Sequence, residues 1–467
     1  RMYFKKLFYA TRPVKLFFIA SLPGAISMLA SALYQLLDGI FVGHVLGDTS
    51  FAALNLAFPF VIINFALADL IGVGSAVPIS VNLGKKKEEE ANNIFTCSAL
   101  MIVVTGAATG AVMFACAPLF IGMMGAEGEL AELAVRYLRV YALCSPVTTI
   151  VFAMDNYLRI CGKIRFSMFL NIFMSVMSAG LEALFLFAFR MDIRGAALGI
   201  CLSMVVCALV AVAPFAAIRM QLRCRRPRFH GGMLRTIVAC GSPNFLNNIA
   251  GRITSILMNV LLLRWGGQDA VNVYGVLMYA DGFIQPLMYG MCDSLQPAVG
   301  YNWGEGKYSR VRAIERCCYI GAGVVSALSV LILMLFPGQI SSLFLEGLAE
   351  NPGLATEAET AMRLFALTYI TRWFSFATQS YMLAVEKSLP AALISVSTAL
   401  VFPMILIGIL WNLRLTGLWL NFALTALLAA VLSGVLLFLL RRQLWRPDEE
   451  REPPVGPSET QEEGVWM

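Results

Sequence analysis

Long apolar stretches separated by short polar segments follow one another along almost the whole chain. Each stretch has about twenty or more residues, which is the length that a helix needs to cross a hydrocarbon layer of roughly 30 Å. Segments of alternating polarity, which a membrane barrel would need, are absent, so helices must pair the backbone groups inside the lipid. We predict an all-α membrane protein with twelve spans, at residues 14–46, 51–80, 91–122, 132–158, 164–190, 195–219, 234–265, 270–300, 310–337, 358–385, 389–411 and 415–441.

The composition agrees with this pattern. Of the 467 residues, 59% are hydrophobic and 14% are charged, which is too apolar for a water-soluble surface of this size. The first stretch contains Asp38 and leads into further spans without a small-residue cleavage site, so we expect a retained span and not a signal peptide. The 11 cysteines form no CxxC pair, and we interpret them as packing residues and expect no metal site.

Basic residues gather in alternate loops, which predicts the orientation. By the positive-inside rule these loops and both termini are cytoplasmic, and this requires an even number of crossings. We expect a monomer in a bacterial inner (cytoplasmic) membrane, in contact with its lipid, and no nucleic-acid partner, because no aromatic-interleaved basic module accompanies the net charge of +6. The basic residues include Lys85, Lys86, Lys87, Lys163, Arg165, Arg223, Arg225, Arg226, Arg228, Lys307, Arg310, Arg441 and Arg442.

Segments near the start of the chain recur in its second half. SLPGAISMLASAL from Ser21 resembles GSPNFLNNIAGRI from Gly241, and Pro23 recurs as Pro243. Six spans return the chain to the same side, so the two halves are parallel and are related by an axis along the membrane normal. We therefore predict an N-terminal six-helix lobe at 1–219, a basic cytoplasmic lobe linker at 220–235, a C-terminal six-helix lobe at 236–441 and a disordered cytoplasmic tail at 442–467.

Several local motifs lie in this repeated frame: YQLLDGIFVGHVLG around Asp38, YLRICGK from Tyr157, NIFMSVMSAGLEALF around Glu182, IRGAALG from Ile193 and QPAVGYNWGEG from Gln296. Taken together, they make residues 12–441 resemble the multidrug and toxic compound extrusion (MATE) family. The resemblance implies two six-helix lobes that export cationic, often aromatic compounds against an inward flow of Na⁺ or H⁺.

Asp38 and Glu182 are the leading candidate residues, because a carboxylate inside a span costs several kcal/mol. Each lies about eight residues from the outer end of its span, which corresponds to about 12 Å of helix. Two acids at one depth in one lobe can hold a proton or a cation between them. The resemblance implies a cation-coupling role for both, although the family usually has Asp at the second position, which leaves H⁺ or Na⁺ open. Tyr34, one turn before Asp38, either donates to its carboxylate or packs at the interface.

Further polar residues lie within the spans. Asn156 and Asn171 are candidate cavity residues, with interhelical hydrogen bonding as the alternative. Near the middle of three spans of the second lobe, we expect Arg252, Asp281 and Arg372 to neutralise one another, either as a structural network or as substrate contacts. Apart from Glu359 at the outer end of span ten, spans seven and ten offer no carboxylate, which argues against a second-lobe cation site.

We predict a cation-coupled antiporter (H⁺ or Na⁺) that exports small organic compounds by alternating access, with no cofactor. The alternative is a lipid-linked oligosaccharide flippase of the same superfamily, which would need a cationic cavity, and Arg252 and Arg372 keep this alternative open. A membrane enzyme is not expected, because the only histidines are His44 and His230, both near loops, and no HExxH or GxSxG motif is present. A channel is disfavoured by the lack of a pore-loop sequence.

Overall fold

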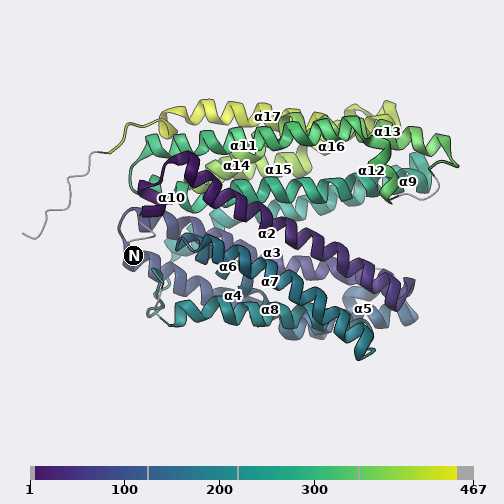
Figure 1. Ribbon diagram of the computed structural model, residues 1–467, viewed down its shortest axis with the longest axis horizontal. Coiled ribbons are helices and arrows are strands. Elements are labelled where there is room, and N and C mark those ends of the chain that lie inside the picture. Colours follow the sequence, from purple (N-terminus) through teal and green to yellow (C-terminus); the bar gives the residue numbers. More distant parts are fainter. Residues whose placement is uncertain (1–5, 124–125, 218–219, 345–347, 450–467) are drawn as a thin grey trace, which may run out of the picture.

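The computed structural model describes residues 6–123, 126–217, 220–344 and 348–449, and within these ranges the regular elements are all helices (Figure 1). The first lobe contains α2 (Pro13–Phe41), α3 (Asp48–Gly84), α4 (Glu88–Met123), α5 (Gly128–Thr148), α6 (Ile150–Ile160), α7 (Ile164–Ala183) and α8 (Ile193–Ala216). The second lobe contains α9 (Gly231–Asp293), α10 (Gln296–Gly304), α11 (Tyr308–Leu335), α12 (Pro337–Phe344), α13 (Pro352–Ala366), α14 (Thr368–Ala384), α15 (Ser388–Val396), α16 (Phe402–Ile409) and α17 (Arg414–Leu444).

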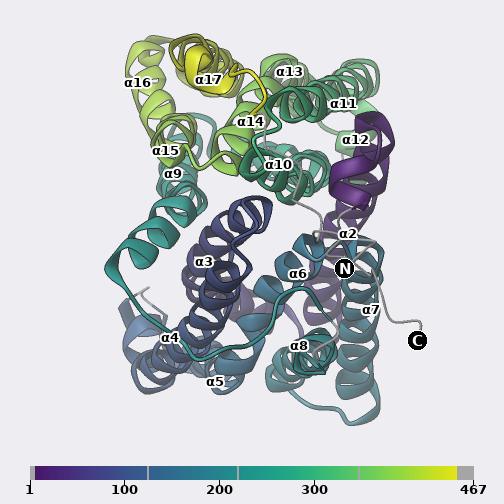
Figure 2. The same cartoon turned by 90° about the vertical axis from the view of Figure 1, so that its left-hand side faces the viewer.

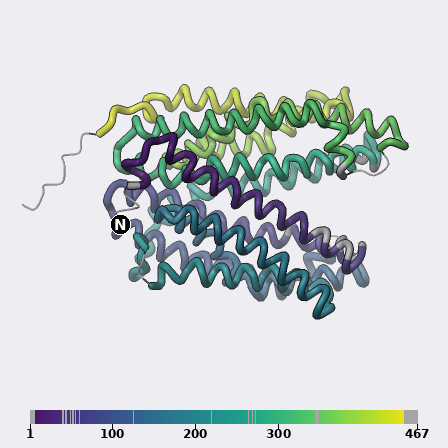
Figure 3. Tube along the Cα trace, in the orientation of Figure 1, coloured from purple at the N-terminus to yellow at the C-terminus, as the bar shows by residue number. Residues whose placement is uncertain are grey.

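The elements of each lobe make six crossings. Figure 3 shows the path of the chain through them. In the first lobe, α5 and α6 form one crossing, and α7 continues through the π-helical turn η3 (Leu184–Ala188). In the second lobe, Gly267 divides α9 into two crossings; its φ of 67° is a left-handed value that glycine adopts without steric cost. Two other crossings are composite: α13 with α14, and α15 with the π-helical turn η4 (Ser397–Val401) and α16.

Charge explains which crossings are easiest to recognise as membrane spans. Within the described ranges, 10 segments are long and apolar enough to cross a membrane. The other two crossings are residues 268–304 and 352–384. These two contain Asp281, Asp293 and Arg372, whose polarity lowers the mean hydropathy of the helix that bears them. The predicted fold class, twelve crossings in two parallel six-helix lobes, is confirmed.

Four similar turns lie at one end of the molecule, after α3, α6, α10 and α14. Each has one residue with positive φ, followed by a lysine whose N–H reaches the carbonyl five residues earlier, which is a common way to end a helix. The positive-φ residues are Lys86, Gly162, Gly306 and Glu386, and the lysines are Lys87, Lys163, Lys307 and Lys387. We call this end, on the left in Figure 1, the basic end.

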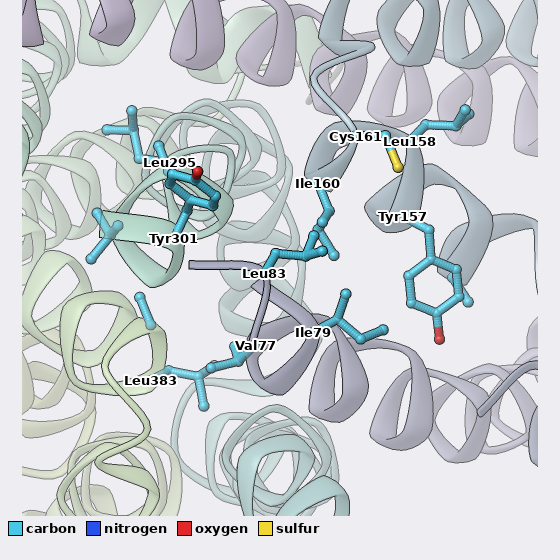
Figure 4. Packing of buried hydrophobic residues seen from close by; sticks show 14 of the residues in the cluster. Val77, Ile79, Leu83, Tyr157, Leu158, Ile160, Cys161, Leu295, Tyr301 and Leu383 are labelled. Carbon is cyan, nitrogen blue, oxygen red and sulfur yellow. The ribbon is translucent and has the colours of Figure 1, made fainter. Parts of the chain in front are cut away.

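The two lobes join at the basic end. Ile79, Leu83 and Tyr157 of the first lobe belong to one buried cluster with Leu295 and Tyr301 of the second (Figure 4). One glycine from each lobe permits this close contact. A Cβ on Gly84 would collide with the Tyr301 carbonyl, and a Cβ on Gly304 would collide with the Val81 carbonyl. Seen from this end, α2 and α3 lie beside α9 and α10 (Figure 2), whereas toward the opposite end the lobes diverge (Figure 1).

Two expected boundaries shift. The segment between the lobes is shorter than 220–235, because α9 begins at Gly231, where the His230 side chain accepts a hydrogen bond from the Met233 N–H and caps the helix. The tail begins later than residue 442, because α17 continues to Leu444 and Asp448 still contacts α11. Residues 1–5, 218–219 and 450–467 lie outside the described ranges.

Candidate functional site

Asp38 and Glu182 are brought together inside the first lobe. Asp38, on α2, is 6% exposed, and Glu182, near the end of α7, is fully buried. The two carboxyl groups are close enough to interact directly. Yet one Asp38 oxygen and both Glu182 oxygens complete no hydrogen bond of ordinary geometry. Buried oxygens of this kind are costly to leave unsatisfied, so a proton or a cation shared by the pair would lower this cost.

A close contact between α7 and α8 determines the position of Glu182. Gly199 of α8 faces the α7 backbone at this residue, and a Cβ on Gly199 would lie 2.9 Å from the Glu182 nitrogen and 3.0 Å from its Cα. Such contacts are tighter than a normal side chain tolerates, so glycine lets α8 approach α7 here. The turn η3 begins two residues later, at Leu184. Local backbone packing therefore fixes the height and direction of the Glu182 side chain.

Three tyrosines surround the pair. The charge of Asp38 acts electrostatically on Tyr34, Tyr137 and Tyr141, and the Tyr137 and Tyr141 rings lie 5.2 Å apart. The hydroxyls of Tyr34 and Tyr137 are buried without a hydrogen-bond partner in the described structure. Tyr34 thus lies beside Asp38, in agreement with the predicted position, while Tyr137 and Tyr141 were not anticipated, because buried tyrosines are common in any core.

No lysine or arginine of the described chain acts on either carboxyl group of the pair. Two carboxylates that interact directly cannot both stay ionised without a counter-ion, so one proton or one cation must be shared between them. Carboxylate and hydroxyl oxygens suit either H⁺ or a hard cation such as Na⁺. The arrangement can therefore exchange one positive charge with solution.

A second polar cluster lies near the basic end and crosses the lobe boundary. Arg159 of α6 is 5% exposed and pairs with Asp155 at 2.9 Å, and its Nη1 donates to Ser294 of the second lobe at 3.4 Å. Asn171 donates to Asp155 at 2.9 Å. Asn171 thus belongs to this cluster and not to the Asp38 site. Arg159 was missed at the sequence level, although Asp155 and Arg159 have the i, i+4 spacing of a helical ion pair.

The second lobe has its own charged pair. Arg372 of α14 donates to Asp281 of α9 at 3.3 Å, and the Tyr369 hydroxyl also donates to Asp281. The expectation that Arg252, Asp281 and Arg372 neutralise one another is wrong for Arg252, which forms no ion pair within the described residues and is influenced by Tyr274 instead. Its helix position explains this, because it lies on an exposed face of α9. Asn156 is partly buried on α6 and takes part in none of these clusters.

Comparison with known proteins agrees with this architecture. The family model MatE matches residues 23–184 and 243–408, one stretch in each lobe. The multidrug export protein MepA of Staphylococcus aureus (strain MRSA252) is 23% identical over 432 residues, covering 91% of this chain and 93% of that protein. MepA of Staphylococcus saprophyticus is 23% identical over 428 residues, with the same coverage of 91% and 93%.

Two solved structures have similar folds. An outward-facing conformation of a multidrug resistance MATE family transporter superposes with a TM-score of 0.88 at 23% identity, over 94% of this chain and 98% of that one. A MOP superfamily transporter from Pyrococcus furiosus, described as having a binding pocket of reverse polarity, gives a TM-score of 0.88 at 23% identity, over 95% of this chain and 98% of that one. These likenesses establish the fold.

Proposed function

Because the chain belongs to the MatE family of membrane transporters, we propose that it is a multidrug efflux antiporter that exports small organic compounds, often cationic, in exchange for H⁺ or Na⁺. The relatives named as multidrug export proteins support the export function. The main support for coupling to H⁺ or Na⁺ is the buried Asp38 and Glu182 pair, which lacks a basic partner among the described residues.

The positive-inside rule supports the orientation in this proposal. The lysines of the basic end, Lys87, Lys163, Lys307 and Lys387, would face the cytoplasm of a bacterium, with both termini on that side. The lobes join at this end, so the described conformation would be closed to the cytoplasm and open to the outside. A monomer with two rocking lobes needs no partner chain for this cycle.

The chemistry of the pair suggests how the ion would drive the cycle. In the outward conformation, a cation from outside would enter between Asp38 and Glu182 and neutralise the charge that the site otherwise keeps uncompensated. A cation can favour one conformation only if it binds that conformation more tightly than the other. The neutralised site would then be compatible with inward rocking, where the ion would leave and a substrate molecule would enter. The ion is therefore a co-substrate and not a resident cofactor.

A transport assay tests this proposal. The full chain is reconstituted in vesicles loaded with ethidium, and dye movement is followed under an imposed H⁺ or Na⁺ gradient. We expect wild type and the control Glu129→Gln, at an exposed acid of α5, to move dye with one of the two gradients. Asp38→Asn and Glu182→Gln should each lose at least ten-fold in gradient-driven rate, because an amide has no titratable proton and no negative charge to attract a cation. Dye movement unaffected by either gradient in folded wild type contradicts the proposal.

A further inference from the structure

Arg252 is an unmatched positive charge within an apolar crossing. It lies in the segment Gly231–Leu262 of α9, which is long and apolar enough to span a membrane, and its side chain is exposed. No carboxylate of the described chain forms an ion pair with it. An arginine at membrane depth is costly to insert, and such residues usually face a polar cavity or a ligand.

The helix geometry shows which way Arg252 faces. Gly241 lies eleven positions earlier on the same helix, which is close to three full turns of 3.6 residues, so the two residues share one face. At Gly241 this face is pressed against the first lobe, where a Cβ would collide with the Leu70 carbonyl of α3. Arg252 therefore lies on the face of α9 that contacts the first lobe at Gly241, about 16 Å farther along the helix from the basic end.

The surroundings of Arg252 add polar groups but no compensating acid. Tyr274, from the next crossing, acts electrostatically on Arg252, and its hydroxyl lies 3.4 Å from the Ser255 hydroxyl, one turn after Arg252. Asp281 also acts electrostatically on Tyr274, but its charge is already matched by Arg372 at 3.3 Å. Arg252 thus keeps a positive charge that no acid of the described residues neutralises.

We propose that Arg252 binds an anionic oxygen group, a carboxylate or a phosphate, on a compound carried between the lobes. A guanidinium can donate two parallel hydrogen bonds to such a group, and a weakly hydrated cation at membrane depth gains more from this contact than it would in water. The Ser255 and Tyr274 hydroxyls border the position that the group would occupy. The inference rests on the proposed function and narrows it: the acids of the first lobe would bind the coupling cation, and the second lobe would select compounds with an anionic group.

Norfloxacin, whose carboxylate accompanies a basic amine, and its methyl ester, which keeps the amine and lacks the carboxylate, form a matched pair of probes. Binding to the full chain in phosphatidylcholine nanodiscs is measured for wild type, Arg252→Lys, Arg252→Gln and the control Arg264→Gln, which removes an arginine near the end of the same crossing. We expect wild type and Arg264→Gln to bind the acid at least ten-fold more tightly than the ester. Arg252→Gln should reduce this ratio to about one, and Arg252→Lys should retain part of it, because lysine keeps the charge but not the forked geometry.

A second arm identifies the source of the anion. If a lipid headgroup occupies the site, phosphatidylglycerol in the nanodiscs will raise the melting temperature of wild type and Arg264→Gln more than that of Arg252→Gln, and it will compete with the acid. An acid-to-ester ratio near one in wild type, together with equal effects of phosphatidylglycerol on wild type and Arg252→Gln, would overturn the inference. Gradient-driven ethidium transport by the same wild-type protein, reconstituted in sealed vesicles, would show that the proposed function stands even then, because ethidium has no anionic group.

Discussion

The two lobes share one fold but place their charge differently. The two stretches that match the family model begin at Pro23 and Pro243, so Asp38 in the first lobe is equivalent to Met258 in the second. The same stretches end at residues 184 and 408, so Glu182 is equivalent to Leu406. Met258 and Leu406 are 1% and 6% exposed. The site that holds two acids in the first lobe is thus filled by two apolar side chains in the second. A repeated backbone does not require a repeated ion site.

Between the second and fourth crossings the difference is the opposite one: the contact is uncharged in the first lobe and charged in the second. In the first lobe, Asn64 donates to Ser145 at 2.7 Å and accepts from Thr109 at 2.7 Å, so this network is neutral. In the second lobe, Asp281 and Arg372 link the same pair of crossings by an ion pair. The Asp38 and Glu182 pair of the first lobe thus has no basic partner among the described residues, whereas Asp281 of the second lobe is paired with Arg372.

Breaking the ion pair of the second lobe should have the largest effect on stability. Arg372→Gln leaves Asp281 without its counter-charge, and we expect a loss of about 3 to 5 kcal/mol. At the neutral network of the first lobe, Asn64→Leu should cost only about 1 to 3 kcal/mol. Thermal unfolding in detergent compares the two variants with wild type. Equal losses would mean that the Asp281 and Arg372 ion pair matters no more to stability than the neutral network of the first lobe.

Disrupting the contact between α7 and α8 at Glu182 should have the next largest effect on stability. Gly199→Ala adds a methyl group about 3 Å from the α7 backbone, and overpacking of this kind costs about 1 to 3 kcal/mol. Because the added group pushes on Glu182, gradient-driven ethidium transport should fall as well. Gly180→Ala is the matched control, since a Cβ there would meet nothing within 4 Å. Similar behaviour of the two variants would argue against a positioning role for Gly199.

Neutralising the acid pair should leave stability unchanged or raise it by about 1 kcal/mol, even though transport is lost. Glu182→Gln and Asp38→Asn remove a buried charge without changing the shape of the side chain. This is the opposite of the expected result at Asp281, where Asp281→Asn should destabilise because Arg372 loses its partner. Melting temperatures of the three variants measure the difference. A strong loss of stability in Glu182→Gln would show that its carboxylate is held by a partner and not free for an ion.

The smallest effect is expected where the tail meets the second lobe. In the first lobe, α4 begins with its own acids, Glu88, Glu89 and Glu90, whereas the first turn of α11 has none. Asp448 fills this role, because its carboxylate accepts hydrogen bonds from the Ser309 N–H at 2.7 Å and from the Ser309 hydroxyl. These hydrogen bonds lower the pKa of Asp448 from its ordinary value of 3.8.

Because folding lowers the pKa of Asp448, its contribution is fully present above the pKa of the unfolded carboxyl and is lost as the pH falls through the lower pKa of the folded protein. Asp448→Asn should cost less than about 1 kcal/mol at pH 7, since the group is exposed to solvent. The difference in melting temperature between wild type and Asp448→Asn should shrink as the pH is lowered from 6 toward 3. A difference that is constant over this range contradicts the assignment.

Much of the architecture follows from the sequence alone. The twelve crossings follow from runs of apolar residues long enough for a bilayer, and the two parallel lobes follow from the recurring proline and glycine segments. The lysines in alternate loops predict which side of the membrane each loop faces. These properties are local or periodic, so they can be read without knowing which helices touch. The same holds for Asp38 and Glu182, because a carboxylate in an apolar stretch stands out by its cost.

Only the tertiary structure decided which polar residues meet. It placed Asn171 with Asp155 and Arg159 at the lobe boundary, separated Arg252 from Asp281 and brought Tyr137 and Tyr141 to the acid pair. The physical reason is that a contact between helices depends on their rotation and on how closely their backbones approach. Small packing details such as Gly199 against Glu182 set both quantities, and these details leave no periodic trace in the sequence.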